Sequence, residues 1–224
     1  IKEGDTDAAV ADYEKAMEYN GDDYELYISI YNNLASVGMT EQGQEYLNKA
    51  FSIKGNSEKD LTARGQIYYL LGQYDNALQE LSAAVEKGST EAYLYLAQTY
   101  DAQGDAENAQ TNYEKYVDSG VADSVAMNAL AKLAIGKGDY AAALSYIEQG
   151  LGMDNVTNRR ELLQNQIIAY EYSGDFRSAW KVVQDYVENY PNDESAKREY
   201  IFLKNRMDPN AIEGEVVQTE EESV

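Results

Sequence analysis

The sequence predicts an all-α fold assembled from repeated pairs of helices. Six glycines recur at steps of 34, 34, 32, 34 and 36 residues, each between two amphipathic helical patterns: Gly4, Gly38, Gly72, Gly104, Gly138 and Gly174. A small residue follows five positions after every one of them: Ala9, Gly43, Ala77, Ala109, Ala143 and Ala179. A period of this length is typical of helical-repeat arrays, in which each repeat buries one face against its neighbours.

Each repeat is expected to comprise a first helix, a glycine turn and a second helix. A half repeat at residues 1–20 supplies only the turn and the second helix. Five complete repeats follow, at about residues 22–56, 57–89, 90–121, 122–156 and 157–192. The glycine can end the first helix in the left-handed conformation, and the small residue lets the two helices approach closely. In four repeats an Asp that can cap the second helix follows the glycine: Asp5, Asp105, Asp139 and Asp175.

The pattern is clearest in the third and fourth repeats. The third has Leu61, Gly65 and Tyr68 before its turn, and Ala77, Leu81 and Ala84 after it. The fourth has Tyr93, Leu96, Ala97 and Tyr100 before its turn, and Ala109, Tyr113 and Tyr116 after it. Spacings of three and four residues place each set on one face of a helix.

These residues resemble the tetratricopeptide repeat, in which two antiparallel helices pair within about 34 residues. The resemblance is to bacterial proteins of this type, and it implies a right-handed superhelical α-solenoid. It also implies a concave groove lined by the first helices, where a protein or peptide binds. Gly150-Leu151-Gly152 departs from the pattern, so an early helix end or a change of curvature is expected there.

Two segments follow the last repeat. Residues 193–207 form one more amphipathic pattern, and this resembles the capping helix that ends many such arrays. Residues 208–224 carry six acidic residues, no basic residue and no apolar stripe, so an acidic tail without structure of its own is predicted.

Composition excludes several classes of function. With 18 basic and 40 acidic residues the net charge is −22, which disfavours nucleic acid as a partner. Cysteine and histidine are absent, which removes disulfides, thiolate nucleophiles and most zinc sites. No constellation of catalytic residues is found either. The sequence therefore predicts a protein that is not an enzyme and that needs no cofactor or metal.

Location is open between two alternatives. No apolar run is long enough to span a membrane, so direct membrane insertion by this segment is not expected. The chain begins at Ile1 without a helix before its first glycine, which suggests a preceding segment that could carry a signal sequence or lipid anchor. We favour an extracytoplasmic bacterial protein over a trimmed cytoplasmic one.

The resemblance places candidate partner-binding residues on the groove side of the first helices. They are Asn32, Thr62, Gln66, Tyr69, Tyr95, Gln98, Asp101, Asn128, Lys132, Gln164, Ile168 and Glu171. Amide groups can pair with a peptide backbone, and tyrosines offer flat apolar area with a hydroxyl. The alternative for each residue is a solvated helix face.

We therefore predict a non-enzymatic interaction scaffold that binds a peptide or protein segment in the groove. The alternative function is a recognition domain of a cell-surface or lipoprotein assembly for glycan or peptide uptake. A third reading is self-association, through the tail or through the open first repeat.

Overall fold

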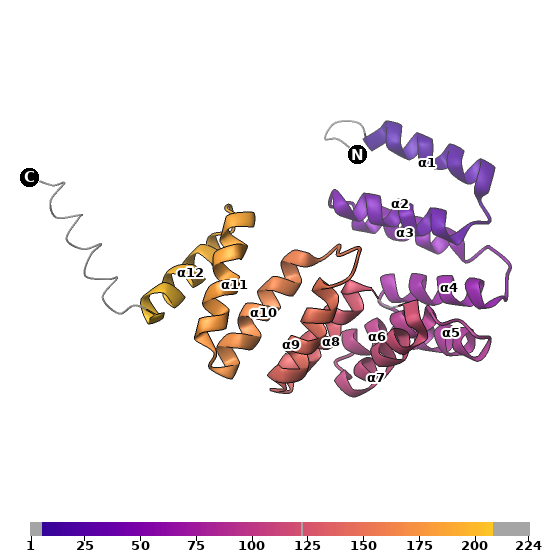
Figure 1. Ribbon diagram of the computed structural model, residues 1–224. Helices are drawn as coiled ribbons and strands as arrows, with labels where there is room; N and C mark the ends of the chain where they lie inside the picture. Colours follow the sequence, from indigo (N-terminus) through magenta and orange to yellow (C-terminus); the bar gives the residue numbers. More distant parts are fainter. Residues whose placement is uncertain (1–5, 122, 208–224) are drawn as a thin grey trace, which may run out of the picture. The chain divides into compact units, whose positions relative to one another are not determined.

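The computed structural model describes residues 6–121 and 123–207, and over these residues the regular structure is helical (Figure 1). The all-α fold predicted from the sequence is confirmed. The chain divides into two compact units, Ile1–Val121 and Ala122–Val224. The predicted acidic tail lies outside the described residues, as do Gly4 and Asp5.

The N-terminal unit contains seven α-helices within its described residues. They are α1 (Thr6–Asn20), α2 (Tyr24–Ser36), α3 (Thr40–Ala50), α4 (Glu58–Leu70), α5 (Tyr74–Glu86), α6 (Ala92–Ala102) and α7 (Ala106–Tyr116). A short π-helical turn at Val117–Val121 follows. The first helices α2, α4 and α6 pack on the second helices α3, α5 and α7 respectively, and also on one another in sequence.

The described part of the C-terminal unit contains five α-helices. They are α8 (Ser124–Gly136), α9 (Tyr140–Leu151), α10 (Arg159–Ser173), α11 (Phe176–Asn189) and α12 (Glu194–Met207). Helices α8 and α9 form one pair and α10 and α11 the next. Helix α12 packs on α11, with Leu203 fully buried and the Tyr200 ring centroid 4.8 Å from that of Trp180.

The turns inside the repeats have the geometry that the glycine period predicts. The described turn glycines all have positive φ, between 71° and 84°: Gly38, Gly72, Gly104, Gly138 and Gly174. The carboxylates of Asp105, Asp139 and Asp175 each accept a hydrogen bond from the backbone N–H three residues later, at 3.0–3.1 Å. Each Asp therefore caps its second helix, as the sequence predicted.

The small residues lie where paired helices come closest. Ala77, Ala109, Ala143 and Ala179 have no exposed surface. At Gly43 a Cβ atom would stand 3.2 Å from the Cα of Tyr31, so here even alanine is tight against the partner backbone. The packing of each pair thus depends on a missing or minimal side chain.

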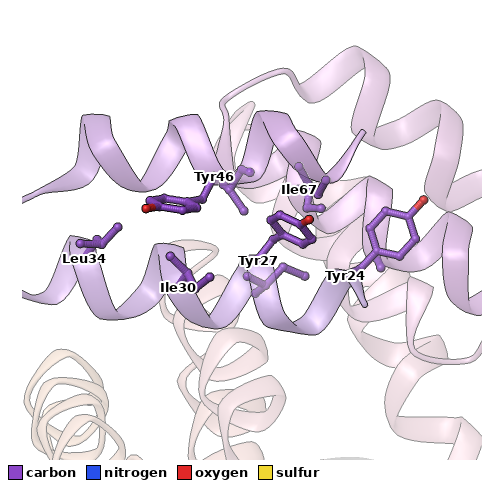
Figure 2. Close-up of a cluster of buried hydrophobic side chains, with 10 residues drawn as sticks. Tyr24, Tyr27, Ile30, Leu34, Tyr46 and Ile67 are labelled. Atoms are coloured by element: carbon purple, nitrogen blue, oxygen red, sulfur yellow. The ribbon is translucent and has the colours of Figure 1, made fainter. Parts of the chain in front are cut away.

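Aromatic and aliphatic side chains fill the core between these pairs. In the N-terminal unit the cluster drawn in Figure 2 combines residues of α2, α3 and α4: Tyr24, Tyr27, Ile30, Leu34, Tyr46 and Ile67. Tyr13 of α1 adds an edge-to-face contact with Tyr46, at 6.3 Å between ring centroids. Many of the tyrosines are therefore structural.

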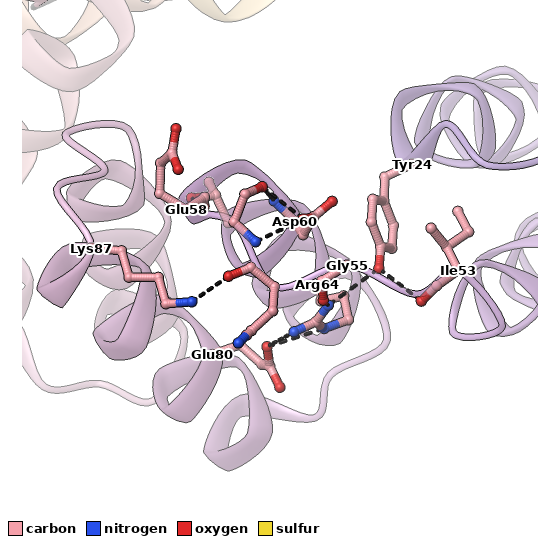
Figure 3. A network of polar contacts seen from close by, with 11 residues as sticks. Tyr24, Ile53, Gly55, Glu58, Asp60, Arg64, Glu80 and Lys87 are labelled. Carbon is pink, nitrogen blue, oxygen red and sulfur yellow. Dashed lines mark hydrogen bonds and ion pairs between the residues drawn. The ribbon is translucent and has the colours of Figure 1, made fainter.

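A polar network fixes the connection between α3 and α4 (Figure 3). The Arg64 guanidinium donates to the Glu80 carboxylate at 2.8 and 3.1 Å and to the Gly55 carbonyl at 2.7 Å. It also donates to the Tyr24 hydroxyl at 3.3 Å, and that hydroxyl donates to the Ile53 carbonyl at 3.2 Å. One side chain thereby joins α2, α5 and the loop before α4.

The expectation at Gly150-Leu151-Gly152 is wrong in one respect. Helix α9 runs through Gly150 to Leu151 and is no shorter than the second helices α3 and α7. Gly150 is instead a close-packing position, since a Cβ there would lie 3.1 Å from the Met127 Cβ and 3.2 Å from Leu162. The irregular turn lies at Val117–Val121, where Gly120 has a φ of 81°.

Replacing Gly65 tests the close packing of α4 on α5. An added Cβ would stand 2.4 Å from the Leu81 Cγ, and Leu81 is fully buried. We expect Gly65→Ala to lower the free energy of unfolding by about 2 kcal/mol, as overpacked cores do. Chemical denaturation measures this. Gly136→Ala is the matched control, because it lies in a helix with no atom near its added Cβ. The free energy of unfolding of Gly136→Ala should be unchanged or higher by about 0.5 kcal/mol. An equal loss of stability in both variants would contradict the packing argument.

Replacing Arg64 tests the polar network. Arg64→Met keeps most of the side-chain volume but leaves Glu80, whose side chain is 24% exposed, without its ion pair. We expect Arg64→Met to lower the free energy of unfolding by about 2 kcal/mol, a value typical of hydrogen bonds to charged groups. Glu80→Gln should cost less, because Arg64 keeps its bonds to Gly55 and Tyr24. A double-mutant cycle that gives no coupling between the two positions would refute the network.

Candidate functional site

The first helices present one continuous side in each compact unit. We call it the first-helix face; it is formed by α2, α4 and α6 in the N-terminal unit and by α8 and α10 in the C-terminal unit. All twelve predicted binding residues lie on these five helices: Asn32, Thr62, Gln66, Tyr69, Tyr95, Gln98, Asp101, Asn128, Lys132, Gln164, Ile168 and Glu171. Their accessibility and their partners differ widely.

In the N-terminal unit the predicted residues range from exposed to buried. Asn32 and Asp101 are exposed, whereas Gln66, Tyr69, Tyr95 and Gln98 are half-buried. Thr62 is buried; its hydroxyl donates to the Glu58 carbonyl at 2.7 Å and lies 2.8 Å from the Ser89 hydroxyl. The Thr62 hydroxyl is therefore buried and already hydrogen-bonded within the protein, so it is poorly placed to bind a ligand.

A pocket of about 300 Å³ opens at the N-terminal ends of α2 and α4, with Thr62 and Gln66 in its wall. It is acidic, and the pKa of Glu25 is raised there by burial and by the charges of Glu91 and Asp23. The neighbouring acids serve the helices. Asp23 caps α2, and Asp60 accepts from both the backbone and the hydroxyl of Ser57 at the start of α4. These contacts account for Asp23 and Asp60 in the acidic lining without a ligand.

In the C-terminal unit the predicted amide group of Asn128 is already paired. Its side-chain oxygen accepts from the Asn165 amide at 2.7 Å, which joins α8 to α10. Lys132, one turn further along α8, is exposed. Asn165 was not predicted, because only contact between two neighbouring first helices reveals it.

The three predicted residues of α10 come together in one pocket. Gln164, Ile168 and Glu171 line a hollow of about 280 Å³ between α10 and α12, with Tyr186 of α11 at its base and Glu199 of α12 opposite. This is the strongest grouping of predicted residues in the described structure.

One end of this pocket is a rigid hydrogen-bonded network. The Tyr186 hydroxyl accepts from Arg160 at 3.0 Å and from Gln164 at 2.8 Å, and it donates to Asp193 at 2.7 Å. Arg160 also pairs with Asp193 at 2.8 Å, and Asp193 caps α12 through the backbone N–H of Ala196. The hydrogen bonds from Arg160 and Tyr186 hold the pKa of Asp193 far below its usual value. The network thus fixes the start of α12 against α10 and α11.

The other end of the pocket holds two carboxyl groups in contact. Burial, together with the hydrogen bond and the charge of Glu199, raises the pKa of Glu171 to about 8. One oxygen of Glu171, Oε1, is enclosed without a hydrogen-bond donor. The site therefore lacks positive charge at the point where two acids meet.

An apolar hollow of about 370 Å³ adjoins this pair, lined by Glu171, Tyr172, Phe176, Glu199 and Phe202. Apolar side chains are unusually accessible around it: Ile168 is 36% exposed, Phe202 52% and Tyr172 70%. We call Ile168, Glu171, Tyr172, Glu199 and Phe202 together the α10–α12 face. Sequence reasoning found only its first two members, because it treated residues 193–207 as a cap alone.

Within residues 6–121 and 123–207 no group of three or more acidic side chains is arranged to hold a metal ion. Within the same part of the chain no helix combines the length and the apolar character needed to cross a membrane.

Comparison with known families agrees with this architecture. A family model described as Tetratricopeptide repeat matches residues 94–158, and a second model of the same description matches residues 1–23 and 61–86. The chain is a tetratricopeptide repeat protein. No curated protein is significantly similar to it in sequence.

Solved structures share this tetratricopeptide repeat fold. PilW, described as a widely conserved type IV pilus biogenesis factor, is 16% identical with a TM-score of 0.68, over 85% of this chain and 89% of PilW. A tetratricopeptide repeat protein from Parabacteroides merdae is 18% identical with a TM-score of 0.63, over 89% of this chain and 78% of its own. YrrB, described as a protein of the same family with an unusual peptide-binding site, is 19% identical with a TM-score of 0.56. The match covers 84% of this chain and 96% of YrrB. These likenesses show the fold.

Tetratricopeptide repeat proteins bind proteins or peptides, and this chain has the fold of such a general interaction scaffold. The family assignment does not select among the twelve predicted residues, which stay predictions.

The raised pKa of Glu171 predicts a pH dependence of stability. An acid whose pKa is higher in the folded state stabilises the fold when protonated, so stability should fall as pH rises from about 4.5 towards 8. Because Glu171 is only partly buried, we discount the effect on the free energy of unfolding to roughly 1 kcal/mol for solvent screening. Glu171→Gln should remove most of the decline between pH 5.5 and 8, measured by denaturation at each pH. Glu161→Gln, on the exposed start of α10, should leave it intact. An unchanged decline in Glu171→Gln would show that another group causes it.

Proposed function

We propose that this tetratricopeptide repeat protein is a non-enzymatic scaffold whose first-helix faces bind a peptide or a segment of another protein. The observation that carries the proposal is the pocket between α10 and α12. It gathers Gln164, Ile168 and Glu171 with accessible apolar side chains at its edge. Such a combination of apolar area with a few polar groups suits a protein ligand.

The remainder of the first-helix face supports the same function in the N-terminal unit. Gln66 and Gln98 keep half-buried amides on α4 and α6, and Tyr69 packs its ring 6.2 Å from that of Tyr74. An amide can pair with a peptide backbone, and a ring held by its neighbour loses little freedom on binding. Asn32 and Asp101 add exposed polar groups at the end of the face.

The alternative functions stay predictions. A recognition domain of a cell-surface or lipoprotein assembly would place the chain outside the cytoplasm, and fractionation of the native source decides this. Self-association would use the open face of α1 or the acidic tail, and light scattering of the chain over a range of concentrations decides that.

Site-specific photo-crosslinking tests the scaffold function. A photoreactive residue at Gln98 of α6 or Ile168 of α10 should capture discrete partner proteins in the native source. The matched controls are Gln79 of α5 and Glu148 of α9, which are exposed on second helices. We expect the first-helix positions to give at least tenfold more product than the controls, quantified by mass spectrometry. Equal capture at all four positions, or none at any, would count against the first-helix face as the binding surface.

A further inference from the structure

We propose that the α10–α12 face recognises a basic segment of a partner protein. In this arrangement an Arg or Lys side chain inserts between Glu171 and Glu199, and flanking apolar side chains pack on Ile168, Tyr172 and Phe202. The inference rests on the proposed scaffold function and narrows its ligand to one chemical class.

The geometry supplies a position for one cationic group. Glu171 and Glu199 project from two different helices into the same pocket of about 280 Å³, and both also line the adjoining hollow of about 370 Å³. A guanidinium or ammonium group carries several N–H donors, so it can bond to two carboxylates at once. Glu171 Oε1, which lacks a donor, leaves the protein side of the site incomplete.

Among residues 6–121 and 123–207, no Lys or Arg lines either hollow. Two arginines of α10 and α12 are engaged elsewhere. Arg160 pairs with Asp193, and the Arg206 guanidinium stacks over the Phe176 ring at 3.8 Å from its centroid. The two carboxyl groups share a hydrogen bond while Glu171 is protonated, and once Glu171 ionises no basic residue of the lining compensates their charge. A cation from outside would then relieve both their repulsion and their burial.

Apolar side chains flank the carboxyl pair on both helices. Ile168 and Tyr172 are one turn apart and share a side of α10. Phe202 of α12 reaches the same hollow as Tyr172. A single charged side chain on solvated helices would bind weakly, but apolar contacts around it exclude water and strengthen the ion pair.

Charge complementarity selects the occupant. The chain has a net charge of −22, so a second copy would be repelled. Residues 208–224 contain six acidic residues and no basic one, so the chain's own tail is unsuited to a carboxylate pair. A basic segment of a different protein fits both the sign of the charge and the apolar surroundings.

Because the site titrates, the affinity for a basic ligand should depend on pH. The titratable groups around Glu171 are Glu199 of α12, Tyr186 of α11 and Tyr172 of α10, whose ring stacks on Tyr140 of α9. Burial raises the pKa of Tyr186, so its hydroxyl stays protonated near neutral pH. With the pKa of Glu171 at about 8, an Arg ligand must displace a proton, and its affinity should be about tenfold higher at pH 9 than at pH 7.

Selection from a random library of short linear peptides, displayed on phage and panned against the whole chain at pH 9, tests the inference. We expect enriched peptides to carry Arg or Lys between apolar residues. Their affinities are then measured by fluorescence anisotropy for the wild type, for the double variant Glu171→Gln with Glu199→Gln, and for the control Glu161→Gln with Glu188→Gln. The control makes the same change in net charge at exposed positions of α10 and α11.

Binding should weaken at least about tenfold in the double variant and stay unchanged in the control. Circular dichroism confirms that both variants fold. Enriched peptides without a basic residue, or equal binding to wild type and double variant, would overturn the basic-segment inference but leave the scaffold function standing. Failure to enrich any peptide would count against both.

Discussion

The close approach of two helices within each repeat is the constraint on which the rest of the structure depends. It is achieved by Ala at the crossing point of the later repeats, each without exposed surface, and by Gly43 against the Tyr31 backbone. A larger side chain there would separate the helices and open the core around it. The left-handed glycine turn makes the approach geometrically accessible, and the Asp cap after it fixes where the second helix begins. Stability is therefore local to each pair and its neighbours.

This local stability determines which surfaces are free for binding. Each second helix packs on the first helix of its own repeat, and α5 and α9 also pack on the first helix of the next repeat. The outer sides of the first helices remain available for binding, except where side chains such as Thr62, Asn128 and Gln164 are already hydrogen-bonded. The described C-terminal unit adds one exception. Helix α12 covers α11 with Leu203 and Tyr200, yet it also turns Glu199 and Phe202 towards α10. The same helix thus closes a core and builds one wall of a pocket.

The periodic part of this architecture could be predicted from the sequence, whereas the contacts between non-equivalent elements could not. Glycine turns, small residues at the helix crossings and Asp caps repeat at fixed offsets, so each occurrence strengthens the prediction of the same element in the other repeats. Gly150 lies at the same offset from its turn glycine as the fully buried Ala50 and Ala84, but its close approach to Met127 and Leu162 depends on two different helices. The pairing of Glu171 with Glu199 likewise depends on where α12, packed on α11, lies relative to α10. The Tyr186–Asp193 network sets that placement, and no spacing in the sequence reveals it.

The position of the two carboxyl groups is informative because folding alone would not favour it. Above the pKa of Glu171, at about 8, both side chains are charged in a partly enclosed hollow. Glutamine at either position could donate a hydrogen bond to the other side chain and would bring no charge, so the ionised pair lowers stability relative to such a substitution. Asp23 and Asp60 of the N-terminal pocket differ in this respect, since they stabilise helix ends. Glu171 and Glu199 cap no helix and pair with no cation in the described structure. Once both carboxyl groups are ionised, a positive group from a partner would make the arrangement favourable, and we therefore expect specificity to reside at this face.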